Sequence, residues 1–513
     1  MKRLIVCADG TWNTPEQQDQ GRPAPTNVYK LHNSIAARSD DSVEQSTYYH
    51  PGVGTEGGWL SRLAGGMWGH GLGDNIQSAY RWLGENYEPG DEVYLFGFSR
   101  GSFTVRSLAG MIGRCGLLQL RELEAHEAWQ RIKAAYSAYR LDGEEYDDTW
   151  CRPEWPRHLP ASAPIHFLGV WDTVGALGIP NDLSILDLLD NPRAWSFHDT
   201  RLGEHVQRAR HAVALDEYRA SFSPALWEGD HSDRDVEQVW FAGAHSDVGG
   251  GYADFGLADI ALKWMVDEAS KAGLKFRDAL IEQVAPNPQG VLHDSYQGVW
   301  QKLRSRPRAV PPVEDASVHT SVQERRETPP ISQAPYRESI TVQPDKPRRV
   351  TIYARERWND TSLFLEPGKY RFSAAGEWLD KSIACGPGGA DDGNFQLGEI
   401  VHIGMTAWGW AERGWRQVTG NRGADFPGTR RIETEPWFAL IGVIANEAHE
   451  PQDCPHAGDA NDGSPRPHVH FGIGDGREFD VQKGGYLFAY ANDAWAMYAN
   501  NRGSVQLVVE RIG

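Results

Sequence analysis

Cysteine is scarce in this sequence, and long hydrophobic runs are absent from it. Five cysteines occur among 513 residues, and none forms a Cys-x-x-Cys pair. We interpret them as reduced thiols of a chain folded in the cytoplasm, with a Cys385–Cys454 disulfide as the alternative. Since no run of about 18 apolar residues is present, the sequence predicts no membrane-spanning helix.

Surplus positive charge and an N-terminal signal peptide are lacking as well. The chain has 51 basic and 70 acidic residues, which gives a formal net charge of −19. Binding to nucleic-acid phosphates needs a basic surface, so we expect no nucleic-acid partner. The apolar run after Lys2 and Arg3 stops at Asp9, which is too short for a signal peptide. Export from the cell would therefore need another route.

Strand-like and helical patterns alternate over residues 1–302. Short β-rich runs lie at residues 4–8, 46–50, 92–98, 165–171 and 236–244. Helical periodicity lies at residues 74–87, 103–112 and 120–140. Several of the strands are apolar on both faces, as buried parallel strands are. This region is predicted to be an α/β domain with a mainly parallel sheet and helices on both faces.

The composition changes at Leu303. Residues 303–347 contain eight prolines and many charges, which predicts a linker or a loosely draped segment. Beyond it helical patterns largely vanish, and strand-like runs alternate with glycine-rich turns. We predict a separate β-sandwich domain over residues 348–513.

The strongest motif is Gly97-Phe98-Ser99-Arg100-Gly101, which joins a strand-like run to a helical run. A nucleophilic serine in hydrolases of the α/β class occupies such a sharp turn, where the flanking glycines prevent clashes. Ser99 is therefore the candidate nucleophile. The plainer alternative is a glycine-rich turn in which Ser99 only caps the helix.

A serine hydroxyl needs a histidine to take its proton and a carboxylate to fix the tautomer of that histidine. Asp172 and His245 each follow a predicted strand. The carboxyl ends of parallel strands meet at one edge of a sheet, where such folds place their sites. We predict that Asp172 and His245 complete a triad with Ser99, and no cofactor is needed for this chemistry.

Both assignments have alternatives. Asp172 can simply cap the turn after its strand, and His245 can be a packed core histidine paired with Asp247. The rival acid is Asp216, and the rival bases are His211 and His319.

An oxyanion hole needs backbone N–H donors near the nucleophile. The N–H of Arg100, at the start of the helix, is the first predicted donor. The second is the N–H of Gly10 or Thr11, in the turn after the first strand. Asp9 in the same turn can instead bind a cation or pin the loop, and residues 50–55 can shape the pocket.

A calcium-binding loop is predicted near the C-terminus. Ca²⁺ prefers about 6–8 oxygen ligands from carboxylates, amides and backbone carbonyls. Asp493, Asn500 and Asn501 offer side-chain oxygens, and Met497 offers its backbone carbonyl. The alternative is a tight turn, since Asn and Asp tolerate turn geometry.

Three further features have both a functional and a structural interpretation. Residues 178–197 are the candidate lid, although their leucines can equally pack on the sheet. Four tryptophans can stack on sugar rings or belong to the sandwich core: Trp408, Trp410, Trp415 and Trp437. His468 and His470 would share one strand face, as zinc ligands or, more simply, as exposed strand histidines.

Six motifs occur in the order ADGTWN, YYHPGVGT, GFSRGS, GVWDTVG, ALDEYR and AHSDVGGGY. Over residues 1–330 they resemble the α/β-hydrolase domain of the type VI secretion lipase effectors of family 1. The resemblance implies a triad of Ser99, Asp172 and His245 and phospholipase A activity on bacterial membrane lipids. It also implies secretion-apparatus and immunity proteins as partners, and export by a type VI system, which needs no signal peptide.

Residues 350–513 resemble the calcium-dependent galactophilic bacterial lectins. The shared segments are LEPGKYRFSAAGEW, CGPGG, WFALIGVI and the loop that contains Asp493, Asn500 and Asn501. The resemblance implies that this loop binds both Ca²⁺ and a carbohydrate ligand. Met497 stands where those lectins have a threonine, and a backbone carbonyl would serve there in either case.

The sequence thus favours a serine esterase, most specifically a phospholipase A-type antibacterial effector. The alternatives are a polysaccharide esterase, a carbohydrate-binding protein on an inactive hydrolase scaffold, and a structural component of an injection machine.

Overall fold

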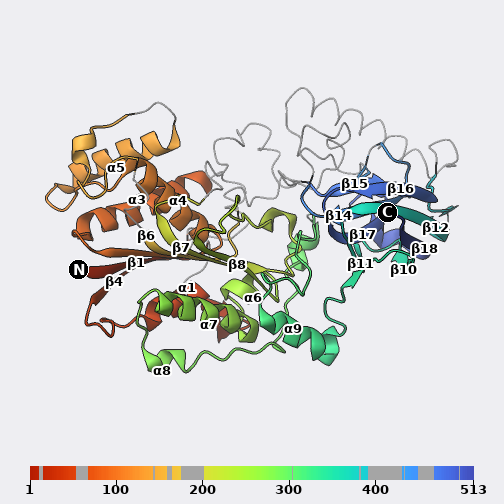
Figure 1. Ribbon diagram of the computed structural model, residues 1–513, viewed down its shortest axis with the longest axis horizontal. Helices are drawn as coiled ribbons and strands as arrows, with labels where there is room; N and C mark the ends of the chain where they lie inside the picture. The colour runs from red at the N-terminus through yellow and green to blue at the C-terminus, as the bar shows by residue number, and fades with distance from the viewer. Residues whose placement is uncertain are drawn as a thin grey trace.

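The computed structural model describes most of the chain and shows two regions of different architecture (Figure 1). The described residues are 1–10, 16–52, 68–141, 145–158, 165–174, 202–302, 304–380, 383–390, 430–432, 434–448, 467–495 and 497–513. Among them, no helix is long and apolar enough to cross a membrane.

The N-terminal region is built on a parallel sheet of six strands, in the order β4-β1-β5-β6-β7-β8. Their bounds are β1 Lys2–Ala8, β4 Glu44–His50, β5 Glu92–Phe98, β6 Ile165–Trp171, β7 Val206–Ala214 and β8 Asp235–Phe241. Every neighbouring pair is parallel. The predicted α/β class is therefore confirmed.

Helices cover both faces of this sheet (Figure 1). On one face lie α3 Trp68–Asn86, α4 Arg100–Cys115 and α5 Ala125–Arg140, and on the other lie α1 Asn27–Ser34 and α7 Gly256–Lys271. Shorter elements are α6 His245–Gly249, α8 Asp278–Ile281 and the β2 Gln18–Asp19, β3 Arg22–Pro23 hairpin. Each face has its own buried apolar cluster, because the strands are apolar on both sides.

Strand β7 was not among the predicted strands. Its sequence, VQRARHAVA, contains two arginines and three alanines, a composition that favours a helix. The structure pairs Arg210 with Glu268 at 2.6 Å and with Asp235 at 2.6 Å, so its charge is neutralised inside the fold. The strand therefore lies between β6 and β8 although its sequence is not continuously apolar.

The C-terminal region is a β-sandwich of two five-stranded sheets. One sheet contains β10 Arg348–Tyr353, β12 Gly368–Asp380, β13 Ile383–Cys385, β16 Gly476–Val481 and β18 Asn501–Arg511. The other contains β9 Ile340–Thr341, β11 Asn359–Leu365, β14 Leu440–Ala445, β15 Val469–Gly472 and β17 Gly485–Ala491. Residues of both sheets share one buried cluster, so this β-rich region agrees with the sequence analysis.

The proline-rich segment is not a loosely draped linker. Residues 317–319 hydrogen-bond to Trp240 of β8, and α9 Thr320–Glu327 follows directly. Val310, Val313 and Val322 are buried in the cluster that also holds β8 and α7 side chains. Strand β9 already belongs to the sandwich, earlier than the predicted start at residue 348. Proline keeps the segment extended, and its valines give it an apolar side to bury.

Candidate active site

Ser99 occupies the turn between β5 and α4 in a strained backbone conformation, with φ 58° and ψ −122°. Its N–H donates to the carbonyl of Trp171 at 3.0 Å, and its exposed fraction is 6%. Ser99 is the N-cap residue of α4, yet its side chain makes no capping hydrogen bond. The alternative role as a helix cap is therefore not supported.

The glycines of the motif are required by close backbone packing. A Cβ atom at Gly97 would lie 2.5 Å from the carbonyl oxygen of Gly101, and a Cβ at Gly101 would lie 2.1 Å from that of Ala8. Both distances are shorter than any side chain tolerates. The GxSxG pattern therefore has a steric cause in this chain, and the turn holds Ser99 at the carboxyl end of β5.

Asp172 and His245 meet at the same edge of the sheet, as predicted. Asp172 directly follows β6, and His245 begins α6 just after β8. Nδ1 of His245 lies 2.6 Å from Oδ2 of Asp172, and the two side chains are 5% and 0% exposed. The His245 ring is packed between Phe98 and Phe222, with ring centroids 4.6 and 4.9 Å apart. This arrangement leaves Nε2 as the free basic position of a neutral imidazole.

The charges of this pair are set by burial and by near neighbours. Burial raises the pKa of Asp172, but the charge of Arg308 and hydrogen bonds from His245 and Arg308 outweigh it and hold the pKa well below its usual range. Burial lowers the pKa of His245 more than Asp172 raises it. An ionised carboxylate beside a neutral imidazole is the state that a general base requires.

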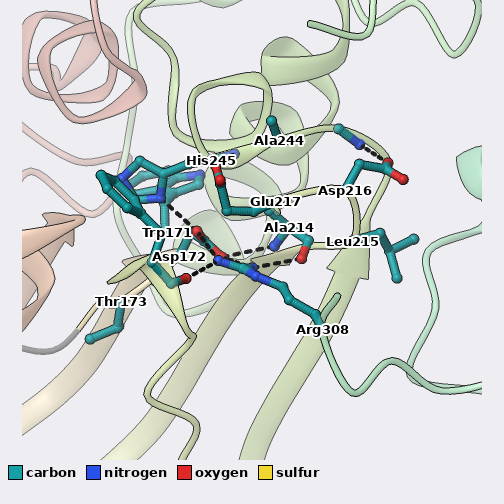
Figure 2. A network of polar contacts seen from close by, with 12 residues as sticks. Trp171, Asp172, Thr173, Ala214, Leu215, Asp216, Glu217, Ala244, His245 and Arg308 are labelled. Atoms are coloured by element: carbon teal, nitrogen blue, oxygen red, sulfur yellow. Dashed lines mark hydrogen bonds and ion pairs between the residues drawn. The ribbon is translucent and has the colours of Figure 1, made fainter. Parts of the chain in front are cut away.

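Arg308 is a residue of the site that the sequence did not indicate. Its Nη1 and Nη2 donate to the two carboxylate oxygens of Asp172 at 2.7 and 2.9 Å. Figure 2 shows the carboxylate of Asp172 held between the His245 ring and the Arg308 guanidinium. Arg308 belongs to the proline-rich segment, where no local pattern distinguishes it from the other arginines.

A second buried carboxylate, that of Glu217, contacts the backbone of His245. Glu217 accepts the backbone N–H of His245 at 3.2 Å and forms a two-point pair with Arg219, at 2.9 and 2.8 Å. Burial raises the pKa of Glu217, but the Arg219 charge and hydrogen bond lower it to about 2. Glu217 thus places a fixed negative charge near His245 without touching its imidazole nitrogens.

The rival residues lie in other networks. Asp216 accepts from the Gly243 N–H, from Tyr336 Oη at 2.8 Å and from Arg337 Nε at 2.9 Å. His211 accepts from the Thr173 N–H at 3.1 Å, and His319 contacts Ser321 and stacks on Phe241. Asp247 pairs with His293 at 2.6 Å rather than with His245.

The predicted oxyanion donors have different surroundings. The N–H of Arg100 lies in the first turn of α4, next to Ser99. The N–H of Gly10 donates to Oδ1 of Asp9 at 2.7 Å, so it would have to leave that carboxylate to serve an oxyanion. Thr11 lies outside the described residues. Asp9 also accepts from Thr26 and Tyr49, at 2.6 and 2.8 Å, which pins the loop after β1.

Several predicted features lie partly or wholly outside the described residues. These are the candidate lid 178–197, residues 53–55 of the segment predicted to shape the pocket, Cys454, Trp408, Trp410 and Trp415. Trp437 is 1% exposed and belongs to the sandwich core. His468 is fully buried, so it is not an exposed strand histidine, and its Nε2 lies 2.8 Å from the carbonyl oxygen of Pro307.

The predicted calcium loop connects β17 to β18. Asp493 is 1% exposed and accepts from Nδ2 of Asn501 at 2.9 Å and from the Ala494 N–H at 2.7 Å. Asn500 ends the short helix Tyr498–Asn500, which follows Met497. Among the described residues, the buried Oδ1 of Asn501 has no hydrogen-bond partner. An oxygen in that state suits a cation.

Fold and site define a chain of the α/β-hydrolase class, and comparison with known proteins supplies the family. Residues 2–268 match the family "T6SS, Phospholipase effector Tle1-like, catalytic domain", which is more than half of the chain. The chain therefore belongs to this family, and the resemblance found in its N-terminal motifs is confirmed.

Individual relatives match only part of the chain and of themselves. The uncharacterized protein YEL023C of Saccharomyces cerevisiae is 34% identical over 242 residues, which cover 43% of this chain and 32% of that protein. An uncharacterized protein from Pseudomonas aeruginosa aligns with 56% of this chain and 49% of its own, at 19% identity and a TM-score of 0.32. The Tle1 effector bound to the VgrG spike aligns with 49% of this chain and 51% of its own, at 19% identity and a TM-score of 0.30. This chain thus spans about half of each structure and a third of the yeast protein.

Proposed function

We propose that this protein hydrolyses carboxylic esters, with Ser99 as nucleophile, His245 as base and Asp172 as the acid that orients it. The observation that carries the proposal is the 2.6 Å contact between Asp172 and His245, both buried, at the sheet edge that also presents Ser99. Membership of a phospholipase effector family supports the same chemistry.

In this mechanism Ser99 Oγ attacks the ester carbonyl carbon, and Nε2 of His245 takes the serine proton. The tetrahedral intermediate then collapses, the ester C–O bond breaks, and His245 protonates the leaving alcohol. In the second half water attacks the acyl-enzyme and gives a proton to His245. The acyl–Oγ bond then breaks, the carboxylic acid leaves, and His245 returns the proton to Ser99 Oγ. Asp172 stabilises the imidazolium in both halves, while the Arg100 N–H supports the oxyanion.

The proposed substrate is a phospholipid of the bacterial membrane, cleaved at an acyl ester as by a phospholipase A. The family description supports a lipid ester. Secretion-apparatus and immunity proteins are the proposed partners; membership of a type VI effector family supports the first of these. We propose delivery into target cells by a type VI system.

The test compares wild type, Ser99→Ala and the control Ser137→Ala, whose serine lies on α5 away from the site. We expect wild type and Ser137→Ala to release fatty acid from phosphatidylethanolamine–phosphatidylglycerol vesicles, and Ser99→Ala to lose at least about 1,000-fold in rate. Cleavage of short p-nitrophenyl esters alone would favour a small-ester or polysaccharide esterase. Equal rates in wild type and Ser99→Ala would refute the nucleophile.

The acid is tested by Asp172→Asn against Asp216→Asn. Asp172→Asn removes the group that orients His245, so kcat should fall by about 1,000-fold or more while KM changes little. Asp216→Asn alters contacts to the Gly243 N–H, Tyr336 and Arg337, none of which belongs to the triad, and its kcat should stay within about threefold of wild type. The reverse ranking would make Asp216 the acid.

We propose a second function for the C-terminal region, a calcium site formed by Asp493, the Met497 carbonyl, Asn500 and Asn501 that also binds a carbohydrate. The unpartnered Oδ1 of Asn501 beside the buried Asp493 supports it. Bound Ca²⁺ would supply a fixed positive charge that draws in sugar hydroxyl oxygens.

Calcium binding should be visible as stabilisation of the protein. In calcium-free buffer, adding 1 mM CaCl₂ should raise the melting temperature of wild type by about 5 °C, and EDTA should reverse this. Asp493→Asn should show no such rise, while the control Asp480→Asn, on the exposed part of β16, should behave as wild type. An equal rise in all three proteins would contradict the site.

A further inference from the structure

An extended segment, residues 304–308, runs between the catalytic sheet and the β-sandwich. The backbone N–H of Arg306 donates to the Tyr218 carbonyl at 2.7 Å, and Ser305 forms a β-bridge with Arg219. Both partners belong to the loop after β7 that also carries Glu217 and Phe222. The segment is therefore attached directly to the loop beside His245.

The end of the segment places Arg308 inside the candidate active site. Besides the two bonds to Asp172, its guanidinium donates to the carbonyls of Ala214 and Phe222, each at 2.6 Å. Its side chain is 3% exposed, and that of Asp172 is fully buried. The planar guanidinium of Arg308 thus holds both the Asp172 carboxylate and the backbone of Phe222. The Phe222 ring in turn packs on His245.

The other side of the segment is held by the β-sandwich. Nε1 of Trp358 donates to the Ser305 carbonyl at 3.0 Å, and Arg306 Nη1 donates to Glu447 at 3.0 Å. His468 accepts the backbone N–H of Glu447 on Nδ1 at 3.2 Å, so its Nε2 carries the proton that is donated to the Pro307 carbonyl. These three sandwich residues hold three consecutive residues next to Arg308.

We propose that Arg308 is a positioning residue for the catalytic acid Asp172, and that the docked β-sandwich holds it in place through Ser305, Arg306 and Pro307. The inference rests on the proposed ester hydrolysis. It means that residues outside the family match of 2–268 complete the active site, and that the sandwich contributes to catalysis as well as to any targeting.

The charges around His245 determine how the loss of Arg308 would appear. Asp172 faces the ring from β6, Glu217 and Arg219 from the loop after β7, and Arg308 from the segment. Arg308 neutralises Asp172, so removing it leaves the full negative charge of Asp172 to favour the imidazolium. The pKa of the Asp172–His245 pair should then rise.

Arg308→Met and Arg308→Lys separate positioning from a merely structural role. For Arg308→Met we expect kcat to fall about tenfold or more with KM within twofold, and the acidic limb of the kcat/KM profile to move up by about half a pH unit or more. Arg308→Lys keeps the positive charge but loses the paired guanidinium hydrogen bonds. The acidic limb of its kcat/KM profile should therefore stay near that of wild type, while its kcat recovers only partly. The extent of Ser99 labelling by a fluorophosphonate probe measures the fraction of protein with a folded site. The rate of labelling should show the same acidic limb in its pH dependence as kcat/KM.

Contacts on the sandwich side are tested by a Trp358→Phe, Glu447→Gln double variant. It removes the Trp358 hydrogen bond and the Glu447 charge that pairs with Arg306, and it touches no residue of the triad, so kcat should fall by about threefold or more with KM unchanged. The control is Arg357→Met, which removes other contacts across the interface, to Tyr296 and the Gln301 carbonyl. Its kcat should stay within about twofold of wild type.

Each outcome decides a different point. Wild type without Ser99-dependent hydrolysis or labelling would overturn the proposed function and this inference together. An active wild type whose Arg308→Met variant keeps the kcat and pH limb of wild type would overturn the positioning role alone. If Arg308→Met does not fold, an Arg308→Lys variant with wild-type kcat would overturn that role in its place. A double variant that matches Arg357→Met would show that the sandwich does not act on the site.

Discussion

At the scale of single residues, the ionisable side chains around Ser99 are buried, so the partners they touch set their charge. Arginines keep the buried carboxylates ionised, Arg308 at Asp172 and Arg219 at Glu217. Burial holds His245 in its neutral form. The site therefore depends on pH through stability as well as through catalysis, because each of these states must be maintained in the folded protein.

His211 provides the clearest pH prediction. Burial, with the charge of Arg106 as a second cause, lowers its pKa to about 3. In the unfolded chain the pKa is about 6.5, so below that pH the unfolded chain binds a proton that the folded chain does not. Stability is therefore lost as the pH falls below about 6.5, and His211 alone should cost about 2 kcal/mol between pH 7 and pH 5. Urea unfolding at the two pH values measures this loss.

The matched variant is His211→Gln, which has no titratable group there. Its stability at pH 7 can be lower than that of wild type, but it should fall about 2 kcal/mol less between pH 7 and pH 5. A loss as large as that of wild type would show that His211 does not carry the effect.

Residues that follow strands were predictable, and residues that join through long-range contacts were not. Ser99 and Asp172 directly follow β5 and β6, and His245 comes shortly after β8, so the parallel topology places all three at one edge of the sheet. Arg308 is 136 positions from Asp172, and nothing in its own neighbourhood indicates that contact. Glu217 was missed because the sequence does not distinguish it from its neighbour Asp216; in the structure Glu217 accepts the His245 N–H, whereas Asp216 contacts Gly243, Tyr336 and Arg337.

At the scale of elements, the junction of β1, β5 and α4 is the tightest part of the catalytic region. Gly101 lies against the carbonyl of Ala8, and Gly97 against the backbone of Gly101. The start of α4 therefore sits where no side chain fits between it and the sheet. This contact fixes the direction of α4 and with it the position of Ser99.

Gly101→Ala should displace α4 or prevent folding. The added Cβ would lie 2.1 Å from the Ala8 carbonyl, and both groups are backbone or backbone-attached, so neither can rotate away. We expect a loss of about 3 kcal/mol or more in the free energy of unfolding, and loss of fluorophosphonate labelling in any folded protein. Gly110→Ala is the control in the same helix, because its Cβ would meet only the end of the Tyr139 side chain, at 3.0 Å. That variant should stay within about 1 kcal/mol of wild type; equal losses in both variants would mean that any alanine in α4 is harmful.

The predicted strands at residues 4–8, 46–50, 92–98, 165–171 and 236–244 have small errors in their ends, whereas α1, α7 and β7 were not predicted. The arginines of β7 are acceptable in a central strand only because Asp235 and Glu268 reach them from β8 and α7. Those partners cannot be identified before the fold is known. Local composition therefore gave no strand prediction at residues 206–214, where tertiary ion pairs stabilise a strand.

At the scale of the whole molecule, the two regions share a buried surface. Ile441, Val443 and Phe488 of β14 and β17 belong to the same apolar cluster as Val310 and Val318 of the connecting segment and the β8–α7 face of the sheet. The sequence indicated two domains and a linker, because proline and charge usually mark exposed chain. Docking depends on valines and arginines spaced along that linker, and their partners lie more than a hundred positions away.

This shared core predicts that the full chain unfolds as one unit. In differential scanning calorimetry, wild type should give a single transition, because neither region can unfold without exposing the apolar surface of the other. Phe488→Ala combined with Arg306→Met removes an interface ring and the pair with Glu447, and should split the transition into two. Phe372→Ala, in the core of the sandwich itself, should lower the melting temperature without splitting the transition. Two transitions in wild type would mean that the domains are stable independently, and the sandwich would then have no rigid hold on the segment that carries Arg308.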